Sequence, residues 1–325
     1  MRSKISALGV KKIFILIVMS FILFSCNKDV EKIEKSPTQN KKIEITTSII
    51  PLASIANYIG GDFVEAKALV PSGVSPHVFD LKPNQLINIE KSDLIVYLNI
   101  EHIDGFLNKA IKSHKNVLSV KDGIELLDSA VHKHEEEGHD EHEEEGHNKH
   151  EKEIHSTDPH IWGSAKNASI IANKILNELV KISPENKVYF EENLESFKNE
   201  LDLAKKSFED KIKGKKENNF IVFHDAYNYL FKELGIKQSN KHIFRKNMLN
   251  DPNSSEMKKL IDKIGELDIK VAFKEPQLDA SNLKNLASDY NLEIFTLNPL
   301  GEDESAKGYI KNYKNNLESI FKIYK

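Results

Sequence analysis

The chain has 325 residues, with 46 Lys and Arg against 50 Asp and Glu, 13 histidines and a single cysteine. This length is typical of about two domains of ordinary size. A net charge of −4 with no concentrated basic region argues against nucleic acid as a partner. One cysteine excludes an intramolecular disulfide framework and any cysteine-cluster zinc finger.

Residues 1–25 have the pattern of an export signal. Basic residues and no acid accompany an apolar run over residues 13–24, which is too short to remain as a permanent transmembrane helix. The run ends in Leu23-Phe24-Ser25-Cys26, which resembles a bacterial lipobox. We therefore expect cleavage before Cys26, lipid attachment to its thiol, and anchoring to a bacterial membrane, with the protein facing the periplasm or the cell exterior. A plain secretory signal with an incidental cysteine is the alternative.

From residue 43 onward the chain alternates strand-like and helical patterns. Short, apolar, β-branched runs occupy residues 43–50, 66–70, 94–98 and 117–120, with helical patterns at residues 51–59, from Pro83, and at residues 103–113. Such runs between helices predict a mostly parallel sheet covered on both faces. Residues 43–183 are therefore expected to form one α/β lobe, which ends with a further helix at residues 165–181.

Two segments outside these elements are too polar to pack in a core. Residues 26–42 are rich in Lys, Glu, Asn and Ser, which is typical of a flexible tether. Residues 132–155 carry ten acids and three lysines, a local balance of −7, together with seven histidines. We expect residues 132–157 to form a disordered loop that binds zinc weakly and captures or senses it; a solvated acidic insertion without a role is the alternative. The histidines of this loop are His132, His134, His139, His142, His147, His150 and His155.

A long helix is predicted to join this lobe to a second one. Ser183-Pro184-Glu185 is a helix start signal, and one apolar stripe then continues to about residue 213. Strands are predicted beyond it at residues 220–223, 271–274 and 294–297, and helices at residues 227–234, 255–267, 281–290 and 306–324. We therefore predict a two-lobed α/β protein, with residues 184–213 as a rigid connecting helix and residues 214–325 as the second lobe. Ligands of such sheets bind outside the carboxyl ends of the strands, so the cleft between the lobes is the expected site.

Three histidines stand where such a cleft would collect them. His77 follows the run at residues 66–70, His160 lies just before the helix at residues 165–181, and His224 ends the strand at residues 220–223. A neutral imidazole is a good ligand for a borderline ion such as zinc, so these three residues are candidate metal ligands. The remaining histidines outside the polar loop have no such context, and we interpret them as ordinary hydrogen-bonded residues; they are His102, His114 and His242.

Several motifs of the chain, taken in order, resemble one protein family. They are Gly73-Val74-Ser75-Pro76-His77, Asp158-Pro159-His160-Ile161-Trp162, His224-Asp225-Ala226-Tyr227, Glu275-Pro276-Gln277 and Leu297-Asn298-Pro299-Leu300-Gly301. From about residue 43 to the C-terminus the chain resembles the cluster A-I solute-binding proteins of bacterial zinc and manganese ABC importers. The resemblance implies two α/β lobes, a rigid connecting helix, and one metal held between the lobes by His77, His160 and His224. It also implies a membrane permease as partner; we expect the protein to be a monomer.

The resemblance also bears on which metal is bound and on the fourth ligand. Members that select manganese or iron tend to have a carboxylate at the third position, so His224 favours Zn²⁺ over Mn²⁺. The family usually has an aspartate where this chain has Asn298. Asn298 can ligate weakly, water or chloride can fill the fourth position, or an acid of the polar loop can reach it; an exogenous ligand, with Asn298 hydrogen-bonded nearby, is favoured. Asp225 and Glu275 are candidate partners that orient an imidazole through its other nitrogen, or are simply solvated or capping acids.

These features predict a non-enzymatic protein that captures Zn²⁺ with high affinity outside the cytoplasmic membrane and delivers it to an ABC permease. A homologue that carries manganese or iron, and a surface adhesin lipoprotein, are the alternatives. An extracellular zinc hydrolase is less favoured. Three histidines with an open fourth position also describe a catalytic zinc, but no HExxH or similar motif supplies a general base.

Overall fold

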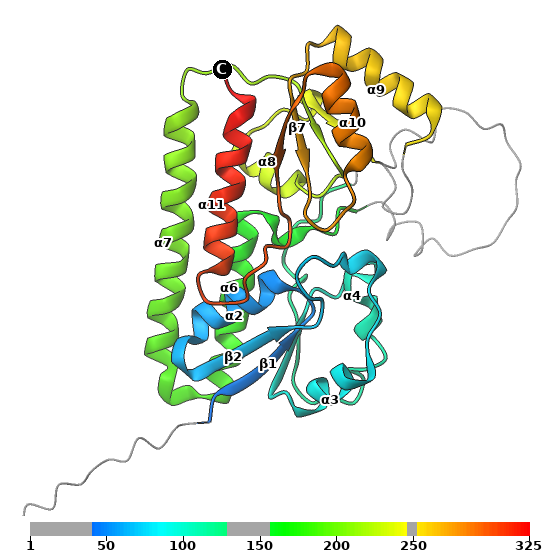
Figure 1. Ribbon diagram of the computed structural model, residues 1–325. Coiled ribbons are helices and arrows are strands. Elements are labelled where there is room, and N and C mark those ends of the chain that lie inside the picture. Colours follow the sequence, from blue (N-terminus) through cyan, green and yellow to red (C-terminus); the bar gives the residue numbers. More distant parts are fainter. Residues whose placement is uncertain (1–40, 129–156, 246–251) are drawn as a thin grey trace, which may run out of the picture. The chain divides into compact units, whose positions relative to one another are not determined.

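The computed structural model describes residues 41–128, 157–245 and 252–325 (Figure 1). The expected export signal, the lipidation site at Cys26 and the seven histidines of the polar loop lie outside the described residues. Within the described ranges, no helix combines the length and the apolar character needed to cross a membrane.

The N-terminal lobe is built on a parallel four-stranded sheet. Its strands are β1 (Ile43–Thr47), β2 (Val64–Ala68), β3 (Leu94–Tyr97) and β4 (Val117–Ser119), in the order β2-β1-β3-β4. Alternate residues of β3 face opposite layers, as expected for a strand buried on both sides. Leu94 and Val96 belong to the core under α2 (Ile50–Gly60) and α6 (Ala165–Ile182), whereas Ile95 packs with Ile89 of α3 (Pro83–Lys91).

The helix predicted at residues 103–113 is wrong in its extent. The structure has only the short helix α4 (Glu101–Asp104), a 3₁₀ turn at Gly105–Leu107 and further turns up to residue 113. The buried carboxylate of Asp104 accepts hydrogen bonds from the backbone N–H groups of Leu98 (2.5 Å) and Ile100 (3.0 Å). An aspartate that binds nearby backbone in this way favours a turn over a continuing helix.

The C-terminal lobe repeats the same topology. Its strands are β5 (Phe220–Val222), β6 (Lys241–Ile243), β7 (Val271–Lys274) and β8 (Glu293–Thr296), all parallel and in the order β6-β5-β7-β8. Phe220 and Val222 face the layer that contains α8 (Asn228–Leu234) and α11 (Gly308–Ile320), whereas Ile221 faces α9 (Ser254–Glu266) and α10 (Ser281–Tyr290). Two parallel four-stranded sheets with helices on both faces confirm the predicted fold class. The sequence pattern did not reveal β6.

The long helix α7 (Lys187–Ile212), which a 3₁₀ turn at Pro184–Asn186 precedes, runs along both lobes (Figure 1). At a rise of 1.5 Å per residue it is about 39 Å long. Its buried stripe packs first on the N-terminal lobe, where Phe197 meets Tyr58, and then on the C-terminal lobe, where Phe208 meets Tyr324. Contacts with α2 and α6 at one end and with α11 at the other make α7 a continuous brace for the two lobes.

Loop residues just before α11 also fasten the C-terminal lobe to α2. Ser54 Oγ donates to the carbonyl of Ser305 (2.7 Å) and accepts from the N–H of Tyr309 (2.7 Å). Asn57 Nδ2 donates to the carbonyl of Glu304 (2.7 Å). Helix α7 and this loop therefore both connect the two lobes.

Candidate metal centre

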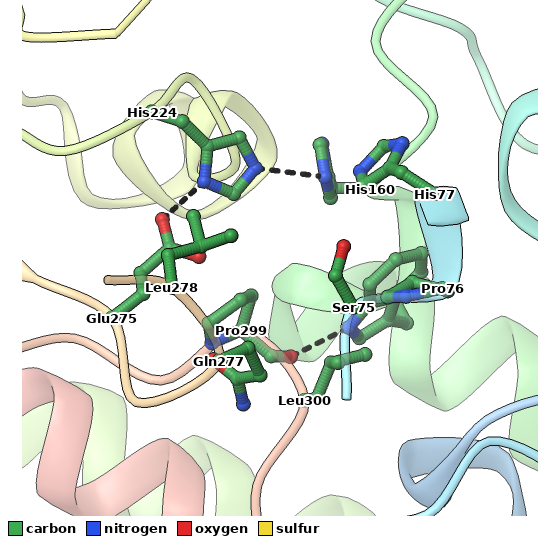
Figure 2. Close-up of a pocket in the computed structure, with 11 residues that line it drawn as sticks. Ser75, Pro76, His77, His160, His224, Glu275, Gln277, Leu278, Pro299 and Leu300 are labelled. Atoms are coloured by element: carbon green, nitrogen blue, oxygen red, sulfur yellow. Dashed lines mark hydrogen bonds and ion pairs between the residues drawn. The ribbon is translucent and has the colours of Figure 1, made fainter. Parts of the chain in front are cut away.

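Three imidazoles from three separate chain segments converge between the two sheets. His77 lies in a 3₁₀ turn (Pro76–Val78) after β2, His160 directly precedes the 3₁₀ turn Ile161–Gly163 ahead of α6, and His224 follows β5. One ring nitrogen from each lies within 4.8 Å of the other two, and His160 Nε2 and His224 Nε2 are 3.4 Å apart. Figure 2 shows the rings turned toward one another. Among the described residues no other group of three or more His, Cys, Asp or Glu side chains converges in this way.

Each histidine has a partner that fixes its ring. Asp158 Oδ1 binds both the N–H of His160 (2.9 Å) and its Nδ1 (2.7 Å), and Glu275 Oε1 binds Nδ1 of His224. The imidazole of His77 bonds to the backbone carbonyl of His102. Holding Nδ1 of His160 and His224 by a carboxylate leaves Nε2 of each as the free lone pair directed to the centre, an arrangement typical of metal-binding histidines.

The surroundings shift the acidities of these groups in different directions. Burial lowers the pKa of His77 well below its ordinary value, and the nearby His160 and His224 add to this effect. Burial also acts to lower the pKa of His224, but the charge and hydrogen bond of Glu275 outweigh it, so that pKa is raised. The pKa of the Asp158 carboxyl is lowered, because its contacts with His160 outweigh its burial. Asp158 is therefore ionised at neutral pH, ready to support a metal-bound imidazole.

The remaining predicted site residues have other contacts. Asn298 Oδ1 accepts hydrogen bonds from the N–H of Leu300 (3.1 Å), the N–H of Gly301 (2.9 Å) and Gln277 Nε2 (2.6 Å). These bonds engage the amide oxygen in the turn after β8, where Gly301 adopts a positive φ of 69°. The structure also places Asp225 against Lys241 Nζ, and its Oδ2 has no hydrogen-bond partner among the described residues.

The three other histidines of the described residues, which we interpret from the sequence as ordinary ones, do not join the cluster. His114 binds the carbonyls of Ser92 and Asn116, both at 3.0 Å, and His242 lies in β6 near Asn219. His102 has an indirect part in the site, through the carbonyl that holds His77.

Sequence reasoning missed two supports of the site, Asp158 and the His102 carbonyl. Asp158 had a readable signal, because its side chain can reach both the backbone and the ring of a histidine two residues later. The His102 carbonyl had none, since its contact with His77 depends on how two loops of the lobe fold together.

The cavity beside the histidines is small. It measures about 10 Å³ and is lined by polar and apolar residues from both lobes, including Ser75, Trp162, Gln277, Leu278 and Leu300 (Figure 2). A space of this size holds about one water molecule. It therefore suits a single ion.

Comparisons with known proteins agree with this geometry. The family model described as zinc-uptake complex component A, periplasmic, matches residues 45–323. The high-affinity zinc uptake system protein ZnuA of Bacillus subtilis (strain 168) is 29% identical over 317 residues, covering 95% of each chain. The manganese ABC transporter substrate-binding lipoprotein PsaA of Streptococcus pneumoniae serotype 4 is 25% identical over 322 residues, covering 95% of this chain and 96% of that protein.

Solved structures share the fold. A crystal structure of ZnuA superposes with a TM-score of 0.72 at 24% identity, covering 87% of this chain and 99% of that one. The laminin-binding protein Lmb of Streptococcus agalactiae, described as having adhesin and metal-transporting activity, gives a TM-score of 0.71 at 22% identity over 87% and 99% of the two chains. Two lobes with converging histidines, and a family match over nearly all of residues 41–325, lead to one conclusion: the chain belongs to the ZnuA/PsaA family, the metal-binding solute-binding proteins of ABC importers, which are not enzymes.

Proposed function

We propose that the protein captures Zn²⁺ with high affinity through His77, His160 and His224 and delivers it to the permease of a zinc ABC importer. The observation that carries this proposal is the convergence of three nitrogen ligands, each oriented by a partner of its own. Around a tetrahedral zinc with Zn–N bonds of about 2.0–2.1 Å, two ligand nitrogens lie about 3.3 Å apart. The pair His160 and His224 already has a separation of 3.4 Å. A small approach of His77 completes the set.

The donor atoms favour zinc over manganese. Imidazole nitrogen suits zinc, whereas manganese prefers carboxylate, carbonyl and water oxygens. Glu275 and Asp158 bind the outer nitrogens of the imidazoles, so their role is to support nitrogen ligands. The relatives include both zinc and manganese proteins, so a competition between the two metals is the direct test of this choice.

For the fourth position we propose water or another exogenous ligand. Three hydrogen bonds already engage Asn298 Oδ1, and turning it toward the histidines would leave two backbone N–H groups and the Gln277 amide without their acceptor. Leaving buried donors unsatisfied costs about 1–3 kcal/mol each, more than a neutral amide ligand is expected to return.

Outside the metal site, we propose an export signal over residues 1–25, a lipid anchor at Cys26 and a tether up to residue 42. Several relatives are named as lipoproteins, and the family model is described as periplasmic. An anchored, tethered protein is kept near its permease, which raises the local concentration of loaded protein at the importer. The test is metal uptake by cells that lack this protein. A loss of uptake that depends on the permease would distinguish metal delivery from adhesion.

We propose that the loop at residues 132–157 is auxiliary to the cleft. Competitive titration with Zn²⁺ and Mn²⁺ is therefore expected to give one high-affinity zinc site in the soluble protein both with and without residues 132–155. The weaker sites of variable number are expected to disappear with the loop, because a sequence rich in histidines and acids binds zinc weakly and at several stoichiometries. If all tight binding is lost on deletion, the assignment of the cleft is wrong; if manganese displaces zinc at equal concentration, the assignment of the metal is wrong.

Zinc affinity is expected to fall as the pH is lowered. Only neutral imidazoles ligate, and the raised pKa of His224 means that this ligand takes up a proton at a higher pH than an ordinary histidine does. The loss therefore begins above about pH 6.5, the ordinary value for histidine, and continues at about ten-fold or more per pH unit below it. The lowered pKa of His77 keeps that ligand neutral over the same range. Chelator competition between neutral pH and about pH 5 measures this, and a constant affinity would contradict the three-histidine site.

A further inference from the structure

A buried lysine pairs with the residue that directly follows one of the proposed metal ligands. Lys241 is the first residue of β6, and its side chain is only 3% exposed. Lysine is almost never fully buried unless it is paired. Here Nζ binds Asp225 Oδ1 and also Asn228 Oδ1 (2.5 Å), and Asp225 is the residue directly after the ligand His224.

Asn228 also lies near Asp158, the carboxylate that holds His160. Asn228 Nδ2 and Asp158 Oδ2 are nevertheless both buried without a hydrogen-bond partner among the described residues. Lys241 therefore joins Asn228 to Asp225, which is next to His224, and this group lies beside the pair of Asp158 and His160 without a hydrogen bond to it. Because these residues come from three stretches of the chain, this arrangement exists only in the folded C-terminal lobe and its contact with the residues before α6.

The buried charged side chains around the imidazoles can be added to give one net charge. Three carboxylates are buried around the imidazoles, namely Asp158 (1% exposed), Glu275 (3%) and the side chain of Asp225 (6%). Lys241 is the one buried cation beside them in the described part of the chain. With neutral imidazoles these side chains carry −2. Asp104, the other buried acid of the described residues, is engaged by backbone N–H groups in the N-terminal lobe and stands apart.

We propose that Lys241 is a positioning residue that sets the charge of the metal site, bringing the buried shell to −2 so that it neutralises a divalent cation held by three neutral histidines. The inference rests on the proposed metal binding at His77, His160 and His224. Without Lys241 the shell would carry −3 and would hold the cation more tightly than delivery requires. Without Asp225 it would carry −1 and would hold the cation too weakly.

The expected size of the effect follows from distance. The charge of the Asp225 carboxylate acts on the His224 ring, and we take a distance of about 10 Å between this carboxylate and a cation held by that ring. At an effective dielectric constant of about 20, a unit charge about 10 Å from a divalent ion changes its affinity by about a few hundred-fold before screening. After screening and local rearrangement, we expect changes of about ten-fold to a hundred-fold.

A double-mutant cycle tests the proposal. Zinc affinity at neutral pH, measured by chelator competition, is expected to fall in Asp225→Asn, to rise in Lys241→Met, and to return to within about three-fold of the original value in the double variant, whose shell again carries −2. If Lys241→Met does not fold, the comparison of Asp225→Asn with the double variant still decides, since Met beside Asn leaves no buried charge unpaired. A merely structural role predicts that the double variant binds no better than Asp225→Asn, and that result would overturn the proposal.

The matched control removes an ion pair of the same chemistry from the surface of the same lobe. Lys258 and Asp262 pair on α9 at 2.8 Å with side chains 76% and 51% exposed, and Lys258→Met with Asp262→Asn is expected to leave zinc affinity unchanged. Absence of tight zinc binding in the unaltered protein would refute the proposed function itself. Tight binding in the unaltered protein with no opposite shifts in the single variants would refute only the role of Lys241.

Discussion

Replacing His224 with alanine is expected to lower zinc affinity by about a hundred- to a thousand-fold, the largest effect on binding that a single substitution in this chain should produce. Binding free energies of about 10–16 kcal/mol for zinc sites with four protein ligands imply about 2.5–4 kcal/mol for each ligand. The substitution also leaves the buried carboxylate of Glu275 without the imidazole that it holds, so the residual site is less well ordered as well as one ligand short.

The measurement is a chelator competition with the folded variant, together with thermal unfolding with and without zinc. A protein that binds zinc only in the native state is stabilised by the ion, and the variant should lose most of that stabilisation. His114→Ala is the matched control, since the partners of His114 are backbone groups of Ser92 and Asn116 in the N-terminal lobe. Unchanged zinc affinity in His224→Ala, or an equal loss in His114→Ala, would show that the metal is bound elsewhere.

Much of the fold could be predicted because buried parallel strands are short apolar runs with few polar residues. Both β3 (Leu94–Tyr97) and β5 (Phe220–Val222) have that composition and were predicted within a residue or two. In contrast, β6 consists of Lys241, His242 and Ile243. Its lysine is buried because it forms an ion pair, and not because the strand is apolar. No periodicity rule finds such a strand, because its burial depends on Asp225, which lies 16 residues earlier in the chain.

The site could be predicted from the sequence to a similar extent. Histidines placed after strands of parallel sheets are brought to one edge by topology alone, and this is why His77 and His224 were singled out together with His160. The supports of the imidazoles depend on side-chain reach. Glu275 follows β7, the neighbour of β5, and does bind His224, whereas Asp225 pairs with Lys241. Which of these two acids binds His224 depends on how β5, β6 and β7 are aligned with one another. This alignment cannot be read from the sequence.

Replacing Trp162 with alanine is expected to produce the largest loss of stability among the substitutions near the site, about 3–5 kcal/mol in the free energy of unfolding. The only tryptophan of the chain is 1% exposed and packs edge to face against the ring of His160, with ring centroids 5.4 Å apart. Its Nε1 donates to the carbonyl of Pro299 (2.7 Å), and its own carbonyl accepts from the hydroxyl of Tyr309 (2.7 Å). The side chain therefore fills the space between the lobes and ties residues before α6 to the loop after β8.

Trp162→Phe separates the two contributions. Phenylalanine keeps most of the ring and loses the donor, so we expect a loss of about 1 kcal/mol, the usual net value of one hydrogen bond, against the several kcal/mol of the cavity in the alanine variant. Urea unfolding followed by circular dichroism measures both values, and unchanged m-values indicate that the comparison is sound. Because the ring also contacts His160, Trp162→Ala should weaken zinc binding more than Trp162→Phe does. If the free energy of unfolding of Trp162→Ala is within about 1 kcal/mol of that of the unaltered protein, this side chain does not hold the space between the lobes. In that case α7 and the loop before α11 must supply the rigidity instead.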